Sequence, residues 1–179
     1  DYIENLMKMQ QDCGADIVAA DVYFDIGTDS KRVRNGLDYG VYRPEEICGR
    51  LLYSGIFYEY GINPHIYTKL MPRELLLPVQ LAVDNRIVAG EDAAVVYPCI
   101  LKSNRVCIAD VCGYHYVQRV GSMTKSGNDN EPERIGILFR YLEKAFIPYD
   151  VEGIFQRQLE QYRKCFLILR YIEYFDRED

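Results

Sequence analysis

The sequence predicts an α/β protein whose last third consists of two helices. Two segments, 15–26 and 106–117, are rich in β-branched and aromatic residues, which pack well on a pleated surface and are typical of strands. Apolar residues recur three and four positions apart over 132–146 and 151–175, a spacing typical of amphipathic helices. Together these observations place both kinds of element in one chain.

Composition limits the classes of protein. With 179 residues, 49% hydrophobic and 27% charged, the chain is long enough for one sizeable core with a helical appendage. A net charge of −6 argues against a general nucleic-acid binder, because phosphate neutralisation needs concentrated basic surface. No run of 18 apolar residues and no signal-peptide pattern occurs, so we expect a cytoplasmic protein, with the inner face of the membrane as an alternative.

The six cysteines show no Cys-x-x-Cys pair and no His-x-x-x-His companion, so the sequence indicates no zinc site. Their even number permits disulfides. Scattered over a chain of this size, however, they are more typical of reduced, buried apolar thiols.

The first forty residues alternate between helix and strand signals. A short amphipathic helix begins near Ile3 and ends at Gly14, which suits a helix C-terminus. The long strand 15–26 follows. Residues 27–38 are polar and predict a loop or hairpin turn, and 39–42 predict a short strand.

Prolines mark the next two helices. Pro44 suits a first helical turn, and apolar residues on one face predict a helix that continues to Gly61. A shorter helix is expected to begin at Pro72 and to end at Pro78, because proline removes a backbone donor.

A central helix is expected from Glu91 to about Lys102, with Gly90 at its N-cap and a bend near Pro98. The strand 106–117 is expected to be broken or bulged at Gly113. The polar segment 121–132 predicts a linker to the last two helices.

Glu91 and Asp92 in this first turn are the candidate catalytic residues. The helix N-terminus carries a partial positive charge, which favours the ionised carboxylate and leaves Asp92 able to accept a proton near neutral pH. The alternative is structural, because acidic residues are common in first turns where they suit the helix dipole.

Three segments occur in a distinctive order: Ile66-Tyr67-Thr68-Lys69-Leu70-Met71-Pro72-Arg73-Glu74-Leu75-Leu76, then Gly90-Glu91-Asp92, then Tyr114-His115-Tyr116-Val117-Gln118-Arg119-Val120-Gly121-Ser122. This order resembles the C-terminal half of bacterial family 2 glycosyltransferases, which commonly read Lys-Leu-Tyr-Arg-Arg-Glu-Leu, a Glu-Asp pair, and Tyr-Tyr-Arg-Gln-Arg-x-Gly-Ser. Asp1-Tyr2-Ile3-Glu4 resembles the end of that family's Asp-Ser-Asp-Asp-Tyr segment. The resemblance covers residues 1–125 and leaves 126–179 as a helical C-terminal extension.

The resemblance implies the later part of a GT-A nucleotide-diphospho-sugar transferase fold, with few mixed strands flanked by helices and the helical pair packed beside them. The nucleotide-binding half, whose Asp-x-Asp holds Mn²⁺ or Mg²⁺, would precede Asp1. We therefore expect a truncated acceptor-side half that binds no metal and is inactive alone. An exposed face left by the missing half would allow a homo-oligomer.

The resemblance also implies an activity: transfer of a sugar, with inversion, from a nucleotide-diphosphate sugar to a saccharide or lipid-linked acceptor, as in cell-surface polysaccharide biosynthesis. Asp92 matches the general base and Glu91 the neighbour that orients it or the acceptor. Arg119, after Gln118, is expected to stabilise the departing diphosphate or to form a structural ion pair. Further substrate-binding candidates are Lys69, Tyr116 and Ser122.

Some of these residues have structural alternatives. Lys69 has the alternative of capping or solvating the short helix. His115 either faces the cleft, opposite the tyrosines beside it, or is a core histidine, and we expect the core position. An alternative function of a different class is a recognition or assembly module that binds a partner through the tyrosine-rich helix 151–175. The enzyme hypothesis requires Asp92 to be accessible in a cleft that Arg119 also reaches.

Overall fold

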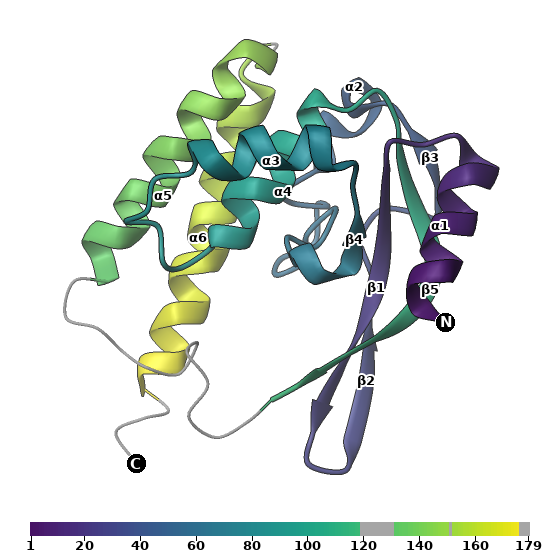
Figure 1. Ribbon diagram of the computed structural model, residues 1–179. Coiled ribbons are helices and arrows are strands. Elements are labelled where there is room, and N and C mark those ends of the chain that lie inside the picture. Colours follow the sequence, from purple (N-terminus) through teal and green to yellow (C-terminus); the bar gives the residue numbers. More distant parts are fainter. Residues whose placement is uncertain (119–130, 151, 176–179) are drawn as a thin grey trace.

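The computed structural model describes residues 1–118, 131–150 and 152–175. It is a mixed α/β structure, in which a curled sheet has α1 on one face and the helices α3 to α6 gathered on the other (Figure 1). The strands are β1 (Ile17–Ile26), β2 (Asp29–Val33), β3 (Gly40–Tyr42), β4 (Lys69–Leu70) and β5 (Val106–Val117). The helices are α1 (Tyr2–Cys13), α2 (Pro44–Ile47), α3 (Arg73–Ala82), α4 (Glu91–Lys102), α5 (Glu131–Phe146) and α6 (Ile154–Phe175).

The sheet has the strand order β2-β1-β5-β3, and the short β4 also pairs with β1. The central strands β1 and β5 are parallel, whereas β2, β3 and β4 each run antiparallel to their partners. Parallel neighbours need a long crossover connection, and here it contains α2, α3 and α4. This crossover carries α4 across one face of the sheet.

Alternation along β1 divides its buried side chains between two cores. Ile17 and Ala19 belong to the large cluster on the side of α4, α5 and α6. Val18 and Ala20 belong to a small cluster under α1. The sequence prediction of a long strand here is confirmed, and so is the preceding helix, which ends at Gly14 with a left-handed φ of 55°.

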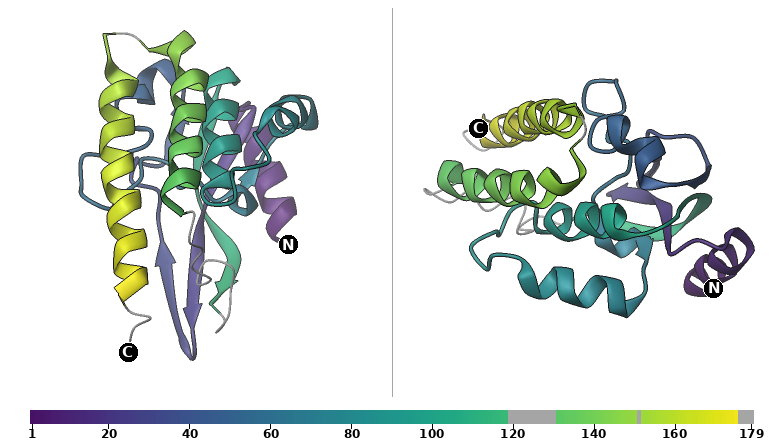
Figure 2. Two further views of the ribbon diagram at one scale, coloured as in Figure 1. Left: turned by 90° about the vertical axis from the view of Figure 1, so that its left-hand side faces the viewer. Right: turned by 90° about the horizontal axis from the view of Figure 1, so that it is seen from above.

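The helix α4 occupies the centre of the large cluster. Its residues 93–101 are all buried, so every side of the helix is covered. Seen from above, α4 lies between the sheet and the pair α5 and α6 (Figure 2). The predicted start of this helix at Glu91, after Gly90, is confirmed.

The strand β5 follows β1 with two irregularities. The register shifts between Ile108 and Cys112, and again between Cys112 and His115. The second shift lies at Gly113, where the sequence predicted a break or bulge. These bulges determine which side chains of the last five residues of β5 face the candidate site.

The predicted helix from Pro44 to Gly61 is wrong. The helix α2 ends at Ile47 and a 3-10 turn, η1 (Cys48–Arg50), follows it. The reason lies far along the chain, in the buried side chain of Gln158 in α6.

The amide of Gln158 satisfies the backbone of this irregular segment. Its oxygen accepts hydrogen bonds from the N–H groups of Leu52 and Tyr53, both at 3.0 Å. Its nitrogen donates to the carbonyl oxygens of Gly49 at 2.7 Å and Tyr53 at 3.2 Å. The Gln158 amide thus replaces the backbone hydrogen bonds that a helix would supply, and the chain can leave the helical conformation. In this irregular backbone the adjacent side chains of Leu51 and Leu52 are both buried.

The prediction that Pro78 ends the third helix is also wrong, because α3 continues to Ala82. A proline at this position removes the hydrogen bond to the carbonyl of Glu74. Both residues are exposed, so water can satisfy that carbonyl. Val79, directly after the proline, is buried and holds the second half of the helix on the core.

A buried carboxylate, that of Asp21, joins β1 to β2 and to the loop after it. One oxygen accepts from Arg32 Nε at 3.0 Å and from the Tyr39 hydroxyl at 2.7 Å. The other accepts from the backbone N–H and the side-chain amide of Asn35, both at 3.2 Å. Arg32 also contacts the exposed Asp110 of β5, so one guanidinium links three strands.

We predict that Asp21→Asn destabilises the fold by about 2–3 kcal/mol, because it presents amide hydrogens to groups that are themselves donors. Urea denaturation followed by circular dichroism measures this loss. Asp110→Asn is the matched control, since it removes the exposed partner of the same arginine and should cost less than about 1 kcal/mol. Equal losses in the two variants would contradict this role for Asp21.

Candidate functional site

The candidate site lies where a 3-10 turn, η2 (Ile66–Thr68), meets the first turn of α4. Gly90 sets the direction of α4 with a left-handed φ of 76°, and a Cβ there would lie 2.5 Å from Leu138 Cδ2 of α5. Glycine therefore allows both this backbone conformation and close packing on α5.

Asp92 is half-buried in this first turn. Its Oδ2 accepts a hydrogen bond from the backbone N–H of Ile66 at 3.2 Å. Burial raises the pKa of Asp92, and Glu91 adds to this effect, while the Ile66 N–H and the Lys69 charge oppose it. The pKa of Asp92 is therefore shifted upward, opposite to the direction expected from a helix N-terminus, and this makes Asp92 a stronger base than an exposed aspartate.

Lys69, the first residue of β4, is anchored on the same turn. Its ammonium donates to the carbonyl of His65 at 3.2 Å and to the hydroxyl of Thr68 at 2.6 Å. Burial lowers the pKa of Lys69 to about 7, although the charges of Asp92 and Asp21 oppose the shift. Near neutral pH this group therefore exchanges between a cation and a neutral amine.

His65 stays neutral in the same region. Its Nδ1 atom is buried and has no hydrogen-bond partner among the described residues. Burial, followed by the neighbouring Lys69 charge, lowers the pKa of His65 to about 4. Its ring stacks on Tyr67 with a centroid distance of 5.3 Å and an interplanar angle of 11°. His65 thus contributes a neutral aromatic ring that packs on Tyr67.

Aromatic rings surround Tyr67 and form a group that we call the aromatic cluster: Phe24, His65, Tyr67, Tyr114 and Tyr116. The ring of Tyr67 lies 4.4 Å from that of Tyr114 and 5.7 Å from that of Tyr116. Asp92 is close enough for its charge to contribute to a raised pKa of Tyr67. Flat apolar faces with hydroxyl groups suit contacts with sugar rings.

The structure brings together three of the residues that the sequence predicted, Asp92, Lys69 and Tyr116. Glu91 lies beside them and is exposed. Gln118 is exposed at the end of β5, where its backbone N–H donates to the Asp25 carbonyl at 3.0 Å. The predicted residues Arg119 and Ser122 lie outside the described residues.

The prediction that His115 is a core histidine is wrong, because its side chain is 53% exposed. Side chains alternate along β5, so Tyr114 and Tyr116 reach the aromatic cluster while His115 points to the other face. There its Nδ1 lies 2.9 Å from Asp25 Oδ2, and its ring stacks on Tyr23 with centroids 4.7 Å apart.

Several contributors to this site were not among the predicted residues. One is the N–H of Ile66, a backbone group that no side-chain pattern indicates. The others are aromatic: Phe24, His65, Tyr67 and Tyr114. Tyr67 and Tyr114 lie in segments of the resemblance, which was an available signal.

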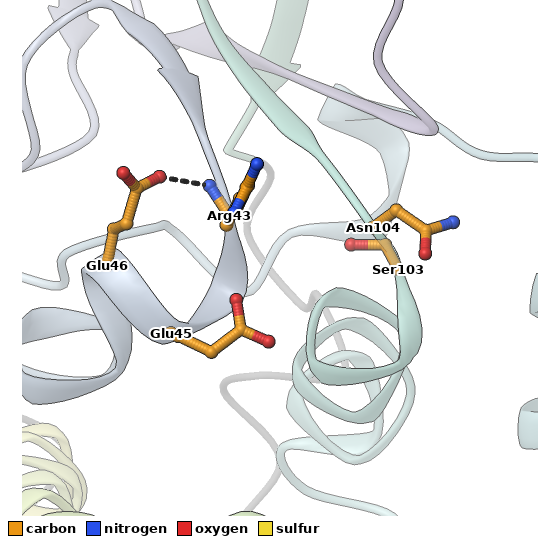
Figure 3. Close-up of a pocket in the computed structure, with 5 residues that line it drawn as sticks. All are labelled: Arg43, Glu45, Glu46, Ser103 and Asn104. Carbon is orange, nitrogen blue, oxygen red and sulfur yellow. Dashed lines mark hydrogen bonds between the residues drawn. The ribbon is translucent and has the colours of Figure 1, made fainter.

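Two open pockets of the described surface lie elsewhere. One, of about 440 Å³, is lined by Arg43, Glu45, Glu46, Ser103 and Asn104, between the start of α2 and the end of α4 (Figure 3). In it the Glu46 carboxylate accepts a hydrogen bond from the Arg43 backbone N–H at 2.6 Å. The other lies between η1 and α6. Neither contains Asp92 or Lys69, so the candidate site is defined by its side chains rather than by either pocket.

No protein-family model and no curated protein sequence matches the chain. A proposal for its function therefore rests on the residues of the candidate site. Over the described ranges, no group of three or more His, Cys, Asp or Glu side chains could hold a metal ion. No helix in this part of the chain has the length and apolar character needed to cross a membrane.

The buried imidazole predicts a pH dependence of stability. The pKa of His65 is about 4 in the folded chain and 6.5 as its ordinary value, so between these values the unfolded chain binds more protons. Its contribution therefore lowers the free energy of unfolding by roughly 2–3 kcal/mol as the pH falls from 6.5 to 4.

Urea denaturation of the wild type and of His65→Phe over this pH range measures that contribution. The variant keeps an aromatic ring against Tyr67 but cannot titrate, so its decline with falling pH should be shallower. Parallel profiles for wild type and His65→Phe would show that His65 does not titrate differently on folding.

Proposed function

We propose that this chain forms the acceptor side of an inverting glycosyltransferase, in which Asp92 is the general base. The observation that carries this proposal is the state of the Asp92 carboxylate. It is half-buried, its pKa is raised mainly by burial, and it is held by Ile66 N–H beside a lysine and an aromatic cluster. The three sequence segments that resemble family 2 glycosyltransferases support it.

In the proposed reaction, one Asp92 oxygen takes the proton of the acceptor hydroxyl as that hydroxyl attacks the anomeric carbon of the donor sugar. The bond to the diphosphate breaks on the opposite face, its electrons leave with the diphosphate, and the configuration inverts. A saccharide or lipid-linked acceptor would place a sugar ring against the tyrosines of the aromatic cluster. The ammonium form of Lys69, fixed by two hydrogen bonds, would favour the ionised form of Asp92 between turnovers.

The donor side belongs to the complete enzyme in this proposal. Arg119 and Gln118 would stabilise the departing diphosphate, a role proposed from the sequence alone. Mn²⁺ or Mg²⁺ would be held by the Asp-x-Asp that the resemblance places before Asp1. The chain alone would then be inactive in transfer.

A second candidate is a recognition or assembly module that binds a partner through α6. The exposure of Leu167, Ile168 and Leu169, at 41%, 39% and 38%, favours it. Tyr162 is buried among Tyr60, Tyr97, Phe139 and Phe166 and holds α6 in the core instead of facing a partner. This candidate requires no reactivity at Asp92.

The two candidates differ in the effect of Asp92→Asn in the full-length parent protein. The enzyme proposal predicts a fall in kcat of about 10²–10⁴-fold, because the acceptor proton loses its base, while donor binding is unchanged. Release of nucleoside diphosphate from a panel of nucleotide sugars measures the rate.

Asp84→Asn is the matched control, since the Asp84 carboxylate is held by Arg86 in the loop before α4 and not by a group of the candidate site. It should keep the wild-type rate. If Asp92→Asn also transfers sugar at a rate close to wild type, Asp92 is not the base and the proposal fails.

A further inference from the structure

We propose that Cys13 and Cys107 form a reversible oxidation site that takes a low-molecular-weight disulfide and converts it to two thiols, leaving a cross-link between α1 and β5. This inference rests on the geometry of two thiols and is independent of the glycosyltransferase proposal. Their sulfur atoms lie 3.0 Å apart although the residues are separated by 94 positions in the sequence. A disulfide bond needs an approach of only about 1 Å more.

Both cysteines are fixed by the elements that carry them. Cys13 is the last residue of α1, directly before the left-handed Gly14. Cys107 lies inside the sheet, paired with Val18 of β1 and Val41 of β3. The close approach of the two sulfurs is therefore imposed by the packing of α1 on the sheet, so the pair is preorganised for closure.

Their environments assign different roles to the two thiols. Cys13 is half-buried, whereas Cys107 is buried, so the first attack is assigned to Cys13. Burial, with a smaller effect from Cys13, raises the pKa of Cys107 to about 12, so Cys107 is a poor first nucleophile.

The exchange balances in two steps. The Cys13 thiolate attacks one sulfur of the small disulfide, whose S–S bond breaks and releases the first small thiol. Cys107 then loses its proton to solvent, and its sulfur attacks the Cys13 sulfur of the mixed disulfide and releases the second thiol. Two protein thiols are oxidised and one small disulfide is reduced.

The cross-link acts on a helix that is otherwise lightly held. Leu6 is the one residue of α1 that is fully buried. At the other end of α1, the Tyr2 ring covers Gly113, where a Cβ would lie 2.7 Å from Tyr2 Cδ2, and it contacts Tyr114 at a centroid distance of 6.5 Å. Oxidation would therefore fix α1 on β5, the strand that supplies Tyr114 to the aromatic cluster.

The test treats the folded chain with excess oxidised glutathione, then alkylates the remaining thiols in denaturant and maps the tryptic peptides. We expect loss of two of the six thiols and a Cys13–Cys107 cross-linked peptide. The peptide 106–119 also contains Cys112, so the mapping is repeated on Cys112→Ser, which should still cross-link.

Thermal unfolding is the second measurement. The melting temperature should rise by about 5 °C or more on oxidation, because the bond closes a loop of roughly 95 residues, and it should return to the starting value with dithiothreitol. Cys13→Ser should show neither the cross-link nor the rise. The matched control Cys48→Ser, which removes another half-buried thiol, should show both.

Three outcomes would overturn the proposal. One is a glutathione adduct that persists on Cys13 without closure, another is a cross-link through Cys112 instead of Cys107, and the third is a closed bond that leaves the melting temperature unchanged or lowers it. The peptide map of the wild-type chain decides the first outcome, and the map of Cys112→Ser decides the second.

Discussion

The complete burial of α4 is the constraint on which the rest of the structure depends. A helix covered on every side by the sheet, α3, α5 and α6 cannot shift without disrupting the main core. Its first turn therefore lies at a fixed distance from the segment that precedes β4. Two hydrogen bonds fasten that segment to α4: Tyr97 OH donates to the Ile62 carbonyl at 3.0 Å, and Ile66 N–H donates to Asp92. The geometry of the candidate site follows from the core.

Elsewhere, buried polar side chains hold segments that have no regular structure of their own. Gln158 satisfies four backbone groups between Gly49 and Tyr53, and Asp21 gathers Arg32, Asn35 and Tyr39. In both cases one side chain replaces the regular hydrogen bonds that irregular backbone lacks. These groups let the long crossover between β1 and β5 stay compact although much of it is neither helix nor strand.

Elements with strong local signals could be predicted from the sequence, and those that depend on distant partners could not. The strand at 17–26 and the start of α4 follow from β-branched runs and from the order Gly90-Glu91. The segment after Pro44 carries a helical pattern, but a glutamine more than 100 residues away overrides it. The sequence placed Asp92 and Lys69 among the candidates. The hydrogen bond from the Ile66 N–H and the lowered pKa of His65 could not be predicted, because both depend on contacts made in the folded chain.

The pKa of the Asp92 carboxyl, measured in the folded chain by carbon NMR as a function of pH, tests the proposed electrostatics of the site most directly. We predict a value above the ordinary 3.8, which rises further in Lys69→Met because the opposing ammonium charge is removed. Asp84 serves as an internal reference, because hydrogen bonds from Arg86 lower its pKa to about 2, a shift in the opposite direction. A pKa of Asp92 at or below 3.8, or one that is unchanged in Lys69→Met, would contradict the proposed electrostatics of the site.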